Sequence, residues 1–183
     1  MAEGRKYEEV VLMTASLARL LRQSISNEDE VVPLAREVEY AKGYLTIQKM
    51  RYKDKLEFEI DVEPSILNIP LIKLVLQPII ENAIYHGLKY KESKGLLQVK
   101  GFMKDGNAVL QVIDNGVGMD EETLSHIYDK HKVNYHSNGV GVYNVQKRLK
   151  LYYGENYGIT YESEKGVGTT ATIIIPGIQE ESI

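Results

Sequence analysis

Apolar residues in the first third of the chain are spaced as they are on helices. They recur every three or four positions, first at Val10, Met13, Leu17 and Leu20 and then at Leu34, Val38, Ala41 and Leu45. Residues 26–30 form a polar turn between the two series, and Pro33 is suited to the start of the second helix. The pattern predicts a helical hairpin over residues 1–55, with one apolar stripe on each helix. Because such a hairpin has no core of its own, it packs on a second copy of itself, the simplest case, or on the rest of this chain.

After residue 55 the helical spacing gives way to alternation. Residues 56–62 alternate strictly between apolar and polar side chains, which is typical of a half-buried strand. Further strands are predicted at residues 98–103, 109–113, 159–162 and 170–175, and helices at residues 70–88 and 140–153. This order predicts an α+β fold over residues 56–183, in which a layered domain carries its helices on one face of the sheet.

The composition limits the classes of function. The 183 residues have a formal net charge of -4, which argues against a protein that holds nucleic acid or an anionic membrane by bulk charge. The chain has no cysteine, so disulfides, zinc–thiolate sites and thiol nucleophiles are excluded. This composition is compatible with a protein of the reducing cytoplasm. The longest apolar run, residues 71–80, is interrupted by polar residues and is too short to cross a bilayer. We therefore expect a cytoplasmic fragment whose only link to a membrane lies in segments upstream of it.

Residues 74–87 place polar side chains inside an otherwise apolar helix. Burying a polar group without a partner costs about 2–7 kcal/mol, so Glu81 and Asn82 are expected to face a pocket. Asn82 and His86 are four residues apart and share one side of the helix, which Gly87 is expected to end. The alternative is a polar network within the core.

Residues 112–120 lead from a strand into the sequence Asp-Asn-Gly-Val-Gly. The strand end would hold Asp114 in place, and its carboxylate can accept a hydrogen bond from an exocyclic amine such as that of adenine. Gly116 and Gly118 would let the backbone turn sharply and lie close to a flat ligand. The alternative is a plain turn, since Asn-Gly is also a strong hairpin signal.

Two more glycine-containing stretches lie later in the chain. Gly139 and Gly141 open a helix, whose free N–H groups and positive dipole end suit phosphate oxygens, although the Gly-Lys-Ser/Thr ending of a Walker loop is missing. Residues 166–170 place Thr169 where a strand begins. The glycines and threonines of this stretch are equally explained by the start of a strand, without any binding role.

Together and in this order, the four stretches resemble the Bergerat ATP-binding fold (GHKL) shared by histidine kinases, gyrase, MutL and the heat-shock chaperones. Residues 77–87, 139–149 and 151–154 look like those of the LytS/YesM-like group of sensor histidine kinases. The likeness extends upstream through residues 17–22 and 44–52 and covers nearly the whole chain. It implies that residues 1–55 are a remnant of the dimerisation and phosphoacceptor region and that residues 56–183 are the ATP-binding catalytic domain.

The resemblance also implies roles for single residues, with ATP and Mg²⁺ as cofactors. Asn82 would coordinate Mg²⁺, Glu81 would orient the metal or its waters, and His86 would be a neighbour of the pocket or a structural histidine. Asp114 would accept from the adenine amine with support from Thr169.

The four glycines share a role in admitting the nucleotide. Gly116 and Gly118 would let the base approach, while Gly139 and Gly141 would meet the phosphates. Residues 120–138 would form a lid over the nucleotide.

Three departures from the family pattern affect the expected activity. Tyr85 stands where histidine kinases often have a lysine near the phosphates, and Pro78 stands where hydrolysing relatives have a catalytic glutamate. None of the four histidines lies in a His-Phe-x-x-Asn type of phosphoacceptor motif. The spacing of His126, His131 and His136 does not match helical or strand metal ligands, so we assign them to the lid.

The sequence thus predicts an enzyme, the catalytic module of a protein histidine kinase in a two-component system. It would transfer the γ-phosphoryl group of ATP to a histidine upstream of residue 1, and from there to the receiver domain of a response regulator. A homodimer would form through the hairpin, and the full-length protein would be anchored in the bacterial cell membrane. The alternative is a nucleotide-binding dimerisation module without transfer activity of its own.

Overall fold

The computed structural model describes residues 30–127 and 139–177, which form one layer of helices on one mixed sheet. The sheet order is β2-β4-β5-β7-β6, with β2 parallel to β4 and the other pairs antiparallel. Its strands are β2 (Leu56–Val62), β4 (Gly95–Lys104), β5 (Asn107–Asp114), β6 (Gly158–Glu164) and β7 (Gly168–Pro176). The predicted α+β class is confirmed, and each predicted strand lies within one of these five elements.

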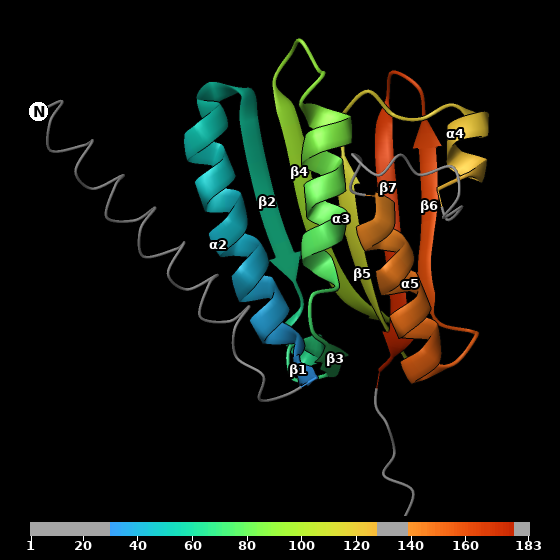
Figure 1. Cartoon of the computed structure of the whole chain (residues 1–183). Coiled ribbons are helices and arrows are strands. Elements are labelled where there is room, and N and C mark those ends of the chain that lie inside the picture. Colours follow the sequence, from blue (N-terminus) through green and yellow to red (C-terminus); the bar gives the residue numbers. More distant parts are fainter. Residues whose placement is uncertain (1–29, 128–138, 178–183) are drawn as a thin grey trace, which may run out of the picture.

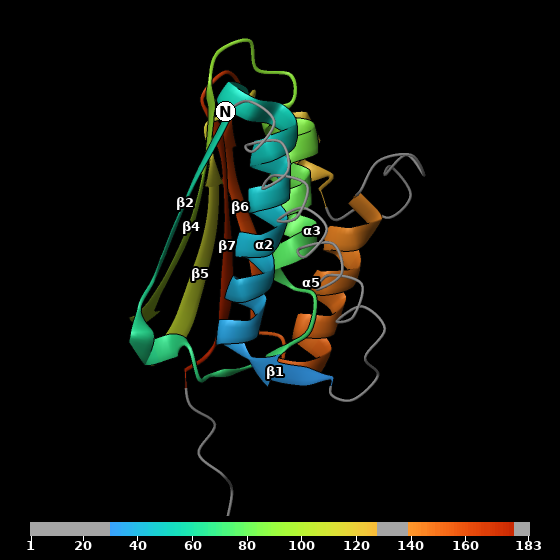
Figure 2. The same ribbon diagram turned by 90° about the vertical axis from the view of Figure 1, so that its left-hand side faces the viewer.

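The helices cover one face of this sheet and leave the other face bare (Figures 1 and 2). They are α2 (Leu34–Tyr52), α3 (Leu76–Asn82), which continues through a π turn as η3 (Ala83–Leu88), and α5 (Gly139–Tyr153). A shorter helix, α4 (Glu121–Ser125), follows the end of β5. Among the described residues, no helix is long and apolar enough to span a membrane.

The second helix of the predicted hairpin, α2, packs on the rest of this chain. Leu34, Ala41 and Leu45 are buried in the same core as the apolar residues of α3 and β4. For this helix the structure therefore shows the alternative arrangement rather than packing on a second copy. The first helix of the hairpin lies outside the described residues, and the division of the chain at residue 55 stays a prediction.

The helix predicted from residue 70 begins later, at Leu76. Residues 70–72 instead form β3 (Pro70–Ile72), which pairs with β1 (Val31–Pro33) in a small antiparallel ribbon. Leu74 then adopts φ 60°, a left-handed conformation that interrupts any helix. Two short 3-10 turns, η1 (Lys53–Lys55) and η2 (Pro64–Ile66), complete the described elements.

The carboxylate of Glu37 on α2 replaces the missing helical partners at the start of α3. Its oxygens accept hydrogen bonds from the backbone N–H groups of Leu74, Val75 and Leu76, at 2.8, 2.9 and 3.1 Å. These N–H groups are at a helix N-terminus, where the backbone has no intrahelical acceptor. Burial raises the pKa of Glu37, while the three backbone bonds and the charge of Arg148 lower it. Glu37 therefore fixes α3, the helix that carries Asn82, to α2.

Candidate functional site

A cavity of about 540 Å³ lies between the helix layer and the ends of two central strands. The predicted site residues Asn82, His86, Asp114, Gly118 and Thr169 all line it. The neighbouring walls come from β5, β6, β7 and the start of the lid segment, including Val112, Met119, Glu122, Thr123, His126, Ile127, Tyr161 and Ala171. Three of the four stretches singled out in the sequence, residues 74–87, 112–120 and 166–170, are thereby brought to one pocket.

Asp114 is a buried carboxylate at the end of β5. Its side chain is 6% exposed, and its Oδ1 accepts a hydrogen bond of 2.8 Å from the Gly116 N–H. Burial raises the pKa of Asp114 to about 6, although the Gly116 bond and the charge of Lys91 act in the opposite direction. A carboxylate that is this poorly solvated gains from a ligand that donates a hydrogen bond to it.

Close packing around Asp114 requires glycine at two positions. A Cβ on Gly87 would stand 2.6 Å from Asp114 Oδ1, and a Cβ on Gly116 would stand 2.4 Å from the Gly87 carbonyl carbon. The Gly87 carbonyl also accepts from the Val117 N–H at 3.1 Å. Gly87 was expected to end the helix, but helical structure continues through Leu88, and the π turn instead presses Gly87 against the strand end.

Asn82 and Glu81 were expected to face the same pocket, but only Asn82 lines the cavity. Asn82 Oδ1 is buried and has no hydrogen-bond partner, so an oxygen ligand is available at the cavity wall. Glu81 Oε1 accepts instead from Gln77 Nε2 at 2.9 Å, and its charge acts on Tyr44 of α2. The prediction that Glu81 is catalytic, by orienting the metal or its waters, stays a prediction.

Tyr85 and His86 lie on different sides of the π turn. Tyr85 is beside Tyr44 and is not among the residues that line the cavity. His86 lines the cavity, and burial together with the charge of Lys89 lowers the pKa of its imidazole. His86 is thus an uncharged neighbour of the pocket at neutral pH, and it does not replace the positive charge that Tyr85 lacks.

Thr169 lies opposite Asp114 in the β5–β7 register, and Ser163 of β6 lies opposite Thr169. The Ser163 hydroxyl oxygen is 2.9 Å from Thr169 Oγ1, and it accepts from the Met119 N–H at 2.8 Å. Sequence reasoning missed Ser163, because no motif contains it and only the pairing of β6 with β7 brings it to the site.

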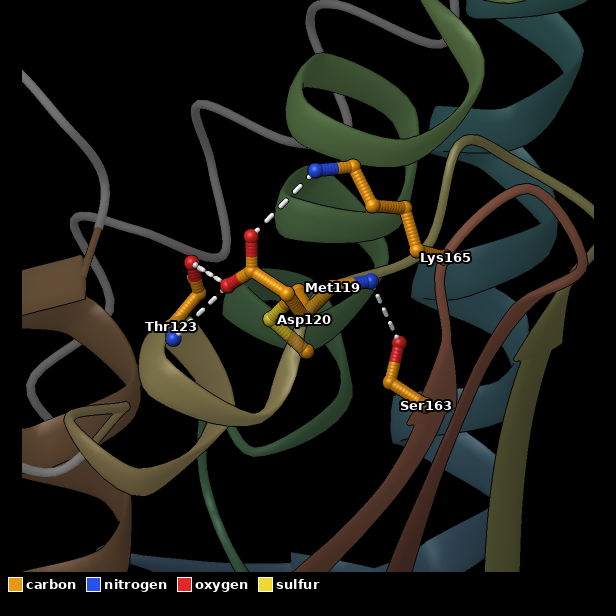
Figure 3. A network of polar contacts seen from close by, with 5 residues as sticks. All are labelled: Met119, Asp120, Thr123, Ser163 and Lys165. Atoms are coloured by element: carbon orange, nitrogen blue, oxygen red, sulfur yellow. Dashed lines mark hydrogen bonds and ion pairs between the residues drawn. The ribbon is translucent and has the colours of Figure 1, made fainter.

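The β6–β7 turn also holds the start of the lid segment (Figure 3). Asp120 accepts from the N–H and the hydroxyl of Thr123, at 3.0 and 2.6 Å, and pairs with Lys165 at 3.3 Å. These partners lower the pKa of Asp120 to about 2. Gly118 has φ 62°, and a Cβ there would stand 1.9 Å from the Glu164 carbonyl oxygen. Residues 128–138 of the predicted lid, with His131 and His136, lie outside the described residues.

The predicted phosphate-binding glycines lie at the start of α5, which begins at Gly139. A Cβ on Gly141 would stand 3.3 Å from Pro78 Cβ, so α5 starts beside α3. Gly141 is not among the described residues that line the cavity, and the contact of both glycines with phosphates stays a prediction. Among the residues that the structure describes, no cluster of three or more His, Cys, Asp or Glu side chains is arranged to hold a metal ion.

Comparison with known families agrees with this arrangement. A family model described as histidine kinase-, DNA gyrase B- and HSP90-like ATPase matches residues 68–179, and a second model, histidine kinase, matches residues 1–56. The chain belongs to the histidine kinase-like ATPase family. The cavity wall from Asn82 to Ala171 falls entirely within the first of the two matches.

The curated relatives of this family member are sensor histidine kinases. The chain is 31% identical to sensor histidine kinase YesM of Bacillus subtilis over 96% of its own length and 29% of that protein. It is 34% identical to sensor protein LytS of Oceanobacillus iheyensis over 76% of its length and 24% of that protein. The chain thus spans less than a third of these relatives.

Solved structures show the same fold at low sequence identity. The catalytic domain of histidine kinase ThkA superposes with a TM-score of 0.60 at 16% identity, covering 81% of this chain and 99% of that one. The histidine kinase domain of the blue-light activated histidine kinase from Erythrobacter litoralis gives a TM-score of 0.59 at 14% identity, covering 96% and 82% of the two chains. The predicted Bergerat-type sheet with helices on one face is therefore confirmed.

Proposed function

We propose that the cavity binds Mg²⁺-ATP and that the chain is the catalytic module of a two-component sensor histidine kinase. The γ-phosphoryl group would pass to a histidine upstream of residue 1 and from there to the receiver domain of a response regulator. The observation that carries the proposal is the buried carboxylate of Asp114 on the wall of a ligand-sized cavity. In a cavity of this kind, a carboxylate next to apolar walls suits a flat base with an exocyclic amine.

The base would lie between the strand ends and the helix that carries Asn82. Ala83, Ile79 and Val112 offer apolar contacts to its faces, while Asp114 accepts from its amine. The glycines at positions 87 and 116 let the end of the helix pack directly on Asp114, because a Cβ at either position would clash. Phosphates would then extend toward the start of α5, where N–H groups without helical partners are available.

Asn82 suits the metal of such a complex. Mg²⁺ takes oxygen ligands, and Asn82 Oδ1 is a buried amide oxygen that has no partner and lies on the cavity wall. When bound, the ion would neutralise charge on the phosphates. The chain's own contribution is to position the nucleotide. Pro78 stands where hydrolysing relatives have a catalytic glutamate, and it has no group that could take a proton from an attacking water.

Dimerisation and the location of the whole protein are parts of the same proposal. One face of α2 is buried in the core of this chain, and we propose the predicted first helix of the hairpin, residues 1–25, as the place of contact with a second copy. The module would work in the cytoplasm, and segments upstream would anchor it in the membrane. A nucleotide-binding dimerisation module without transfer activity is the second candidate, favoured by the absence of a phosphoacceptor motif from these 183 residues.

Replacement of Asn82 by alanine tests the metal assignment. We expect Asn82→Ala to weaken the binding of Mg²⁺-ATP by about tenfold or more and to change the affinity for metal-free ATP much less, because one metal ligand is lost. Calorimetric titration with and without Mg²⁺ measures both affinities. Asn68→Ala, at an exposed loop position, is the matched control and should change neither. Equal losses with and without the metal would assign Asn82 to packing instead.

A further inference from the structure

Three polar side chains lie in a row across the ends of β5, β7 and β6. Asp114 is opposite Thr169, and Thr169 is opposite Ser163. Asp114 and Thr169 line the cavity, whereas Ser163 does not line it and borders a neighbouring hollow that Asp114 and Thr169 also border. A ligand inside the cavity is therefore affected by Ser163 through Thr169 rather than by direct contact.

The Ser163 hydroxyl makes three hydrogen bonds. It accepts from the Met119 N–H at 2.8 Å, donates to the Gly168 carbonyl oxygen at 3.0 Å, and is 2.9 Å from Thr169 Oγ1. A hydroxyl has one proton and two lone pairs, and a carbonyl oxygen only accepts. All three bonds can form together only when Ser163 donates to the Gly168 carbonyl oxygen and Thr169 donates its own proton to Ser163.

This direction of donation determines what Thr169 offers to a ligand. With its proton directed to Ser163, the Thr169 oxygen has only lone pairs for the cavity. The ionised carboxylate of Asp114 on the neighbouring strand also only accepts. The end of the cavity therefore carries two adjacent acceptors, which suit the two N–H bonds of a 6-amino group and oppose the lone pairs of a 6-oxo group.

We infer that Ser163 is a positioning residue that makes the site selective for 6-aminopurines over 6-oxopurines by fixing the hydroxyl direction of Thr169. The inference rests on the proposed function, since it concerns the base that the Asp114 cavity binds. Ser163 also accepts a hydrogen bond from the N–H of Met119, another residue of the cavity wall (Figure 3).

The test compares ATP with inosine triphosphate, which has an oxo group in place of the 6-amino group. In Ser163→Ala the Thr169 proton is free to point into the cavity and donate to that oxygen. We expect the ratio of the two affinities to fall by about tenfold, the effect of one hydrogen bond. Ser163→Thr keeps the hydroxyl and should restore the wild-type ratio, while Ser65→Ala, at an exposed serine far along the chain, should leave it unchanged.

A double-mutant cycle separates this role from a general structural one. In a Thr169→Val background, Ser163→Ala should no longer change the ratio, because the hydroxyl through which it acts is gone. An unchanged ratio in Ser163→Ala, or an equal fall with and without Thr169, would overturn the inference while ATP binding by the wild type still supports the proposed function. If the wild-type chain binds neither nucleotide, the proposed function and the inference both fail.

Discussion

Replacement of Asp114 by asparagine is expected to abolish ATP binding and to leave the fold intact. The amide can keep the bond from the Gly116 N–H, but it loses the charge and can direct an N–H group at the adenine amine. We expect the affinity to fall by about a hundredfold or more, on the order of 3 kcal/mol. Calorimetric titration with Mg²⁺-ATP measures the loss, and circular dichroism verifies the fold.

The same substitution should stabilise the nucleotide-free protein. Burial raises the pKa of Asp114 from 3.8 to about 6, so the folded state holds a proton that the unfolded state has released. The contribution of this carboxyl to stability is therefore fully present below pH 4 and is lost as the pH rises to 6. At pH 7 we expect Asp114→Asn to raise the free energy of unfolding by up to about 3 kcal/mol, and at pH 4 to change it little.

Asp61→Asn is a suitable control, since Asp61 is exposed and lies on β2, away from the cavity. It should change neither ATP affinity nor, beyond about 0.5 kcal/mol, the stability at pH 7. A folded Asp114→Asn protein with near wild-type affinity would remove Asp114 from base recognition. An unchanged stability at pH 7 would show that its carboxylate is solvated.

The second large effect, on the free energy of unfolding, is expected from replacement of Glu37, which is far in sequence from the residues that line the cavity. Glu37→Ala leaves three N–H groups at the start of α3 without the carboxylate that accepts from them, and it removes a negative charge that interacts with Arg148. Loss of a buried hydrogen-bonded carboxylate of this kind should lower the free energy of unfolding by about 2–4 kcal/mol. Urea denaturation measures the change as a lower midpoint with an unchanged slope.

Glu39→Ala provides the matched control on the same helix. Glu39 is exposed and pairs with Arg36 at 3.5 Å, so its removal should cost no more than about 0.5 kcal/mol. Equal effects of the two substitutions would mean that the desolvation of Glu37 offsets its hydrogen bonds completely. The connection between α2 and α3 would then depend on apolar packing alone.

The sequence predicted those parts of the molecule that depend on local pattern. Alternation over residues 56–62 identified β2, and the motif residues Asn82, Asp114 and Thr169 meet at one cavity. The strand is readable from the order of residues within one element. The shared site of the three motif residues was implied by the resemblance to a known family, because it depends on contacts between elements.

Features that depend on long-range contacts were not readable. The ribbon of β1 and β3 has three residues in each strand, too few for a pattern, and it forms only because α2 brings the two segments together. Glu37 caps a helix about 40 residues further along the chain. Glu81 and Asn82 are adjacent on a helix and so point about 100° apart, which is why only one of them lines the cavity.

Phosphoryl transfer to an upstream histidine is measured most directly with ATP labelled at the γ-phosphate. A longer chain that includes the proposed upstream phosphoacceptor histidine should take up label that is stable in alkali and lost in acid, and its Asp114→Asn variant should not. The 183-residue chain alone should bind ATP and remain unlabelled, because transfer needs an acceptor within attack distance. A longer chain that binds ATP without taking up label would contradict the account. So would stable labelling of the 183-residue chain at His86, His126, His131 or His136.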